Sequence, residues 1–175
     1  MNERYLAAVH EAGHVVLNTI FDIPVEYAEV TTQVINGIEY VSSCSSTIFH
    51  ETGIKNMNAI EKEKHAALWL ISTAAGIAAE MMAGASDREE QWVADFHQLD
   101  ILMPKEADIN IPIAGAIHFL SDFSGIREAH AIIGEKLFTK GRIESDEIHS
   151  IVDSKITREE KNNIKQEIWY YILQQ

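Results

Sequence analysis

One long apolar run limits how this chain can fold: residues 66–85 read AALWLISTAAGIAAEMMAGA. It is the only stretch of the sequence long enough to span a bilayer as a helix. Ala and Gly dominate the run and Glu80 lies inside it, and both features disfavour insertion into a membrane. We therefore expect a buried central helix in a soluble protein, with no membrane partner.

The segments around this run predict further helices and one β-hairpin. Residues 25–34 and 38–47 are rich in β-branched residues and flank Asn36-Gly37, a dipeptide typical of a tight hairpin turn. We expect a mainly α single domain over residues 1–175, with a small β-hairpin or sheet. Its predicted helices cover residues 4–20, about 59–84, about 87–103, about 112–139 and two short C-terminal segments, the last opening with a capping box at Thr157 and Glu160.

The charge of the chain excludes one class of partner. The 175 residues contain 14 Lys and Arg against 27 Asp and Glu, a net charge of −13. This excess repels phosphate backbones, so we expect no nucleic-acid partner. Cys44 is the only cysteine, which excludes an internal disulfide and is typical of a reducing compartment. Because a helix is predicted to begin close to Met1, we expect no signal peptide and a cytoplasmic location.

The first predicted helix carries a metal-binding pattern. His10, Glu11 and His14 form an H-E-x-x-H motif, and the i, i+4 spacing places both imidazoles on one face of a helix, one turn apart. Two such histidines are ligands typical of Zn²⁺, and a glutamate beside them is suited to general base and acid catalysis. The motif therefore predicts peptide-bond hydrolysis by a zinc enzyme, with Glu11 as its catalytic residue.

A simpler interpretation of the motif is two partly buried histidines on an amphipathic helix. The surroundings favour the metal site, because the motif lies on a helical segment with apolar neighbours. Gly13 also stands in the middle of this helix, where glycine costs about 1 kcal/mol. We expect another element to approach the helix closely at Gly13.

A catalytic zinc needs a third protein ligand and an open position. A histidine six residues beyond His14 would stand at position 20, which is Ile20, so the third ligand comes from a distant segment. Asp95 is favoured, because the apolar residues that follow it direct its helix towards the core, whereas Asp87 is better suited to a helix N-terminus. The candidates on chemistry alone are Glu80, Asp87, Asp95, His97, Asp100, His118 and Asp122.

The segment 8–16, AVHEAGHVV, resembles the active-site helix of FtsH-type zinc metalloproteases. In that family a strand pair, a helix with a Gly-x-x-Ala-Glu stretch and a helix with an aspartate zinc ligand follow. This chain repeats the order with the predicted hairpin, with Gly76 to Glu80, and with Asp95 in the next helix. The resemblance covers residues 5–153 and leaves 154–175 as a C-terminal helix, whose aromatic end we expect to dock on its own domain or on another subunit.

The resemblance implies a zincin-type helical peptidase domain with Zn²⁺ bound by His10, His14 and Asp95. Two roles are open for Glu80 on its chemistry: a contact that orients a ligand histidine, or an ion pair with a basic group in the core. The resemblance implies for the hairpin either binding of an extended substrate by strand addition or a covering role only. The chain departs from the family at Ile77, where Arg is usual, and at Met81, where an acidic residue is usual.

Family members normally carry an ATP-driven unfoldase, and this sequence contains no G-x-x-x-x-G-K-[ST] phosphate loop. We therefore expect an ATP-independent zinc metallopeptidase that cleaves unfolded or extended polypeptides, served by a separate unfoldase or by self-association. The net charge adds the hypothesis that basic or neutral segments are preferred. The alternative is a catalytically silent, protease-like binding or regulatory domain.

Overall fold

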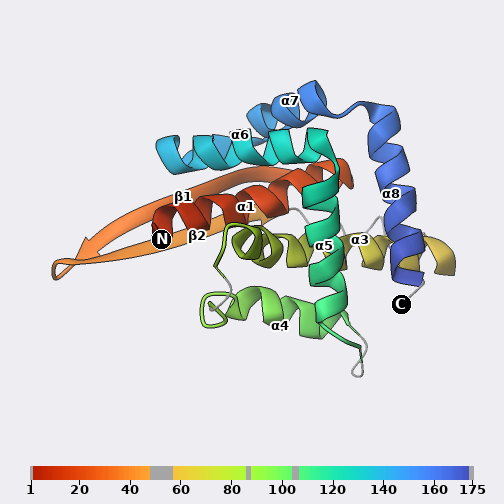
Figure 1. Ribbon diagram of the computed structural model, residues 1–175, viewed down its shortest axis with the longest axis horizontal. Helices are drawn as coiled ribbons and strands as arrows, with labels where there is room; N and C mark the ends of the chain where they lie inside the picture. The colour runs from red at the N-terminus through yellow and green to blue at the C-terminus, as the bar shows by residue number, and fades with distance from the viewer. Residues whose placement is uncertain (1, 48–56, 86–87, 104–106, 174–175) are drawn as a thin grey trace.

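The computed structural model describes residues 2–47, 57–85, 88–103 and 107–173. Within these ranges the chain forms seven helices and one antiparallel sheet of three strands (Figure 1). The prediction of a mainly α protein with a small sheet is confirmed. We expected the aromatic end of the chain to dock on its own domain or on another subunit. The side chains of residues 169–173, which would make this contact, lie outside the described part of the structure.

Two long helices form the centre of the fold. Helix α1 (Glu3–Ile20) begins at Asn2, whose side chain accepts a hydrogen bond from the amide of Tyr5, and helix α3 (Ala59–Met82) begins with a capping box. All residues from 71 to 80 of α3 are buried, and 61% of its most apolar window lies inside the protein, although its length and composition alone would suit a membrane span. The predicted central helix is thus a core helix of this fold.

Helices α1 and α3 cross at Gly13. A Cβ atom at this position would lie 2.5 Å from the carbonyl oxygen of Ala75, well inside contact distance. Only glycine lets the two backbones approach so closely. The expected close approach at Gly13 is confirmed, and α3 is the element that makes it.

The sheet covers one side of α1. Strands β1 (Val25–Ile35) and β2 (Ile38–Thr47) form the predicted hairpin, and Asn36 and Gly37 have the positive φ angles, 54° and 79°, that the turn requires. The short strand β3 (Arg142–Glu144), which we did not predict, pairs with the other edge of β1. The order β2-β1-β3 leaves β2 as an outer strand of the described sheet.

Two predicted helices have different bounds in the structure. Helix α4 (Val93–Leu102) is shorter than the predicted 87–103, because residues 88–92 form turns and Arg88 makes ion pairs with other elements. The predicted helix 112–139 is two helices, α5 (Asn110–Asp122) and α6 (Ser124–Lys140), separated by extended backbone at Phe123. The break lets α5 pack on α3 while α6 packs on α1.

The C-terminal part consists of α7 (Ser145–Lys155) and α8 (Arg158–Leu173). The predicted capping box of α8 is confirmed: the Thr157 amide donates to Glu160 Oε2 at 2.7 Å, and the Glu160 amide donates to Thr157 Oγ1 at 3.2 Å. Helix α8 packs against α3 and α5 (Figure 1).

Candidate metal centre

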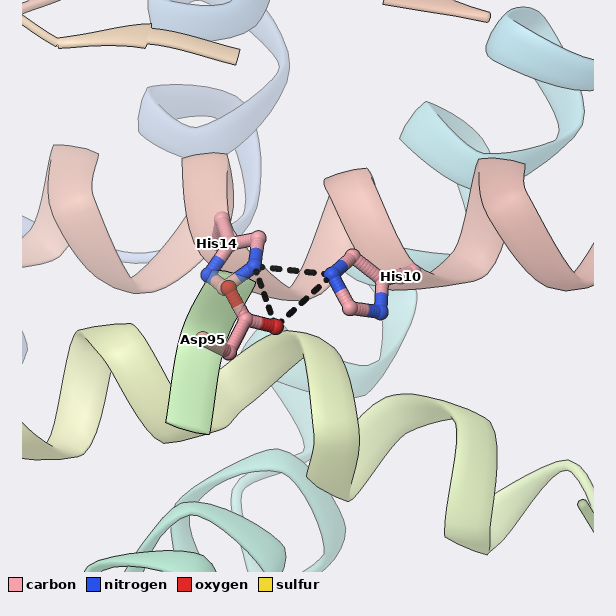
Figure 2. A group of neighbouring side chains, drawn as sticks. All are labelled: His10, His14 and Asp95. Atoms are coloured by element: carbon pink, nitrogen blue, oxygen red, sulfur yellow. Dashed lines mark hydrogen bonds and ion pairs between the residues drawn. The ribbon is translucent and has the colours of Figure 1, made fainter. Parts of the chain in front are cut away.

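Three side chains from two elements converge on one point between α1 and α4 (Figure 2). His10 and His14, one turn apart on α1, bring their Nε2 atoms to 3.0 Å of each other. Asp95 in the first turn of α4 places Oδ2 at 3.0 Å from His10 Nε2 and 3.6 Å from His14 Nε2. Among the described residues, this is the group of His, Cys, Asp and Glu side chains with the geometry to hold a metal ion.

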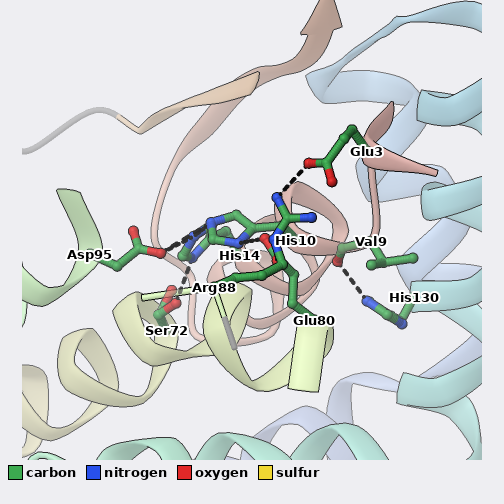
Figure 3. A network of polar contacts seen from close by, with 9 residues as sticks. All are labelled: Glu3, Val9, His10, His14, Ser72, Glu80, Arg88, Asp95 and His130. Atoms are coloured by element: carbon green, nitrogen blue, oxygen red, sulfur yellow. Dashed lines mark hydrogen bonds and ion pairs between the residues drawn. The ribbon is translucent and has the colours of Figure 1, made fainter. Parts of the chain in front are cut away.

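The outer nitrogen of each imidazole is held by α3 (Figure 3). His10 Nδ1 lies 2.9 Å from Glu80 Oε1, and His14 Nδ1 lies 2.9 Å from the carbonyl oxygen of Ser72. Because a carbonyl oxygen only accepts hydrogen bonds, Nδ1 of His14 carries a proton, and in the neutral ring Nε2 presents its lone pair to the cluster. Such outer contacts are the usual means by which proteins orient histidine ligands of metals.

Glu80 belongs to a chain of charges that links three elements. Its Oε2 lies 3.0 Å from Nε of Arg88, and Nη2 of Arg88 lies 2.9 Å from Glu3 Oε2 at the start of α1. Glu80 is only 3% exposed, so the guanidinium compensates a carboxylate that burial would otherwise destabilise. The two alternatives for Glu80, orienting a histidine and pairing with a basic group, are both present in the structure.

Gly76 on α3 lies directly beneath the two imidazoles. A Cβ atom at this position would overlap Nε2 of both His10 and His14. Any other residue would therefore fill the space beside the two nitrogen atoms. Glycine leaves that space open, next to the point on which the three side chains converge.

The charges of the cluster favour a cation. Burial lowers the pKa of His10, but its contacts with Asp95 and Glu80 outweigh burial and raise the pKa to about 10. The pKa of His14 is also raised, because the Asp95 carboxylate outweighs burial, and the pKa of Asp95 is held well below its usual range by the two histidines. Positive charge among these groups is thus strongly stabilised, whether it comes from protons or from a metal ion.

Glu11 lies at the edge of the same cluster. Its side chain is buried, with 4% of the residue exposed, and Oε2 finds no hydrogen-bond partner among the described residues. It lines a cleft of about 300 Å³ together with His10, His14 and Asp95. A carboxylate that lines the cleft beside the cluster is suited to exchange a proton with a molecule bound there.

The cleft is lined by α1, β2, α3 and the α4 region. Ser43, Cys44 and Ser45 of the outer strand β2 form one side, and residues of the α4 region form the opposite side. Trp69 of α3 also lines the cleft: it is partly buried and packs against the core on its other side.

The remaining candidate ligands lie elsewhere. Glu80 contacts the outer nitrogen of His10 and not the cluster, and His97 and Asp100 are exposed on α4. His118 and Asp122 pair with each other at 2.8 Å on α5. Asp87 lies outside the described residues.

Sequence reasoning missed four residues that shape the centre: Trp69, Ser72, Gly76 as a spacer, and Arg88. Ser72 acts through its backbone, so its side chain carries no signal, and the contacts of Arg88 depend on the turns before α4. A glycine inside the apolar run is the one signal that could have identified Gly76 as a position of close approach. No known family model matches the chain, and no curated protein matches its sequence.

Proposed function

We propose that this protein is a zinc-dependent metallopeptidase of the FtsH type that hydrolyses peptide bonds in unfolded or extended polypeptides. The observation that carries the proposal is the convergence of His10, His14 and Asp95 beside the buried carboxylate of Glu11, in an open cleft. Two imidazole nitrogens and one carboxylate oxygen form a typical donor set of catalytic zinc, which keeps further positions for water and substrate.

The residues present fit such a metal. Asp95 Oδ2 is buried and faces the Nε2 atoms of both histidines, and Gly76 keeps the adjacent space open. His10, His14 and Asp95 would hold the ion, while Glu80 and the Ser72 carbonyl orient the two rings. When bound, zinc lowers the pKa of a water molecule to about 7 and polarises a carbonyl group.

Glu11 performs the proton transfers in this mechanism. Its carboxylate, which lines the cleft, accepts a proton from the attacking water and later returns the proton to the nitrogen of the leaving amine. The adjacent ring contacts keep His10 and His14 fixed during both steps, so that only the substrate and the proton move. The exposed outer edge of β2 supports binding of the substrate as an added strand across the cleft.

The substrate class follows from the same features. Strand addition requires an extended backbone, and the sequence carries no phosphate loop to power unfolding. We therefore propose ATP-independent action on polypeptides that are already unfolded, or that a separate unfoldase or another copy of the chain presents. A cytoplasmic location remains part of this proposal.

The decisive experiment compares the zinc-loaded wild-type chain with Glu11→Gln, using casein as an unstructured substrate. We expect the wild type to cleave casein and Glu11→Gln to bind zinc equally well but to lose cleavage by at least about 100-fold. Equal cleavage by both proteins would reject the peptidase. Zinc bound by both proteins with cleavage by neither would favour the alternative, a silent binding or regulatory domain.

A further inference from the structure

A second cavity continues the cleft on the other side of His10. It measures about 800 Å³ and shares His10, Ser43 and Gln91 with the first cavity. Strand β2 forms a wall of both, with residues 43–45 in the first cavity and 39–43 in the second. A groove therefore runs along β2 from Glu39 to Ser45, past the candidate metal centre.

The second cavity is the acidic part of this groove. Glu3, Glu39 and Glu80 line it together with two basic side chains, Arg88 and His10. Arg88 is already bound by Glu3 and Glu80, and Glu39 pairs with no cation in the described part of the chain. Glu39 is therefore the carboxylate of this cavity whose charge is left uncompensated.

The wall of the second cavity also suits the stem of a long basic side chain. The cavity is also lined by Ala7 and Val41, apolar surface on which the methylene groups of a long side chain can lie.

We propose that the second cavity is a subsite for a lysine or arginine side chain of the substrate, with Glu39 as the carboxylate that binds its charge. This inference rests on the proposed function, because it assigns a specificity-determining residue to the same groove. Glu39 lies on the same face of β2 as Val41 and Ser43, since alternate residues of a strand share a face. The methylene groups would pack on Val41 and the charged end would reach Glu39.

The strand geometry sets the position of the basic residue. Glu39 and Ser43 are four residues apart, so the residues opposite them in an added strand are also four apart, about 14 Å along the strand. Ser43 is the strand residue common to both cavities and lies beside His10. The basic side chain is therefore about four positions from the bond at the metal centre, on one side of that bond only.

The test uses fluorescein-labelled unstructured peptides that carry a single Lys, Gln or Glu at successive positions. Their affinity for zinc-loaded Glu11→Gln protein is measured by fluorescence anisotropy, and their cleavage by the wild type is followed by mass spectrometry. At one position we expect Lys to bind about two- to fivefold more tightly than Glu, the size of an exposed ion pair. The preference should shrink at high salt, because the carboxylate is open to solvent.

Glu39→Lys should reverse the preference at that position. Glu159→Lys, with the same change in net charge on the exposed surface of α8, should leave it unchanged. Equal affinity of Lys and Glu peptides at every position, an equal effect of Glu159→Lys, or no peptide binding at all would overturn the subsite. A Lys preference in binding without cleavage by the wild type would support the subsite and reject the peptidase.

Discussion

Helices α1 and α4 supply the candidate metal ligands, yet they are held in the fold very differently. Twelve of the 18 residues of α1 are buried, whereas Leu99 is the buried residue among the 10 of α4. Asn2 caps α1 through its side chain, and α4 begins at Trp92 without a side-chain cap. Two ligands are thus built into the core, and the third stands on a helix with little packing of its own.

This difference indicates what a metal would contribute to the protein. The histidines are oriented by α3 before any metal binds, through Glu80 and the carbonyl of Ser72. Asp95 is attached chiefly through its contacts with these histidines. We therefore expect zinc to join α4 to the core, since the free energy of metal binding adds to the stability of whatever elements carry the ligands.

The largest expected effect on zinc binding comes from a side chain at Gly76, which would fill the space beside His10 and His14. In Gly76→Ala, the new Cβ would overlap both Nε2 atoms, so we expect zinc affinity to fall by about 100-fold or more. The free energy of unfolding should also fall, by about 1–3 kcal/mol. Zinc titration and urea unfolding measure the two effects.

The matched control for Gly76 is Gly134, another buried helical glycine. A Cβ atom there would meet its nearest neighbour, Val9 Cγ1, at an ordinary 3.6 Å. Gly134→Ala should therefore retain zinc binding and gain up to about 1 kcal/mol, as expected for alanine in a helix. If Gly76→Ala behaved like Gly134→Ala, the close packing of α3 against the histidines would be wrong.

The second prediction compares the two helices by amide hydrogen exchange. In the metal-free protein, α4 should exchange much faster than α1, because few of its side chains are buried. Zinc at 100 times its Kd should slow exchange in α4 by up to about 100-fold. Asp95→Ala should abolish this slowing. Equal protection of α1 and α4 without metal would contradict the comparison.

The third prediction concerns the charges that hold His10 from outside. Arg88→Gln removes the cation beside Glu80 and Glu3, so His10 is less firmly oriented. We expect zinc affinity to fall by about 10-fold, which is the smaller of the losses usually seen when a residue that orients a metal ligand is removed. Arg158→Gln on the exposed surface of α8 makes the same charge change and should bind zinc as the wild type does. Equal losses in both variants would assign the effect to net charge.

The smallest effect is expected behind α1, at His130 of α6. Its Nε2 donates to the carbonyl of Val9 at 2.9 Å, and burial lowers its pKa. Below pH 6.5 the unfolded chain binds a proton that the folded chain resists, so this group makes stability fall as the pH falls, by at most about 1.4 kcal/mol per pH unit.

His130→Gln keeps a donor for Val9 without a titrating group, and its thermal melting temperature should vary less between pH 7 and pH 5 than that of the wild type. Melting curves of the metal-free proteins give the comparison. The same acid dependence in both proteins would exclude His130 as its source.

Most of the fold was predictable wherever a local signal exists. The hairpin turn at Asn36 and Gly37, the capping box at Thr157 and the bounds of α1 all follow from short patterns. The break at Phe123 and the strand β3 were not predicted, because neither has a local cause: the break suits the packing of α5 and α6 on different partners, and three residues form a strand only by pairing with β1.

The candidate site divides in the same way. His10, Glu11 and His14 were identified from a spacing of four residues, because the period of a helix places such side chains together without help from the rest of the chain. Asp95 was one candidate among several carboxylates and histidines. Only the packing of α4 against α3 brings it, and not Asp100 or Asp122, to the two imidazoles.

The sequence by itself determined the central helix, the hairpin and the face of α1 that carries two histidines, since these depend on hydrophobic periodicity, turn chemistry and helical spacing. The tertiary structure alone decided which carboxylate joins them, that Gly76 leaves space beneath them, and that Arg88 and Glu3 support Glu80. Contacts between residues distant in the chain depend on how helices pack, and no local pattern encodes that arrangement.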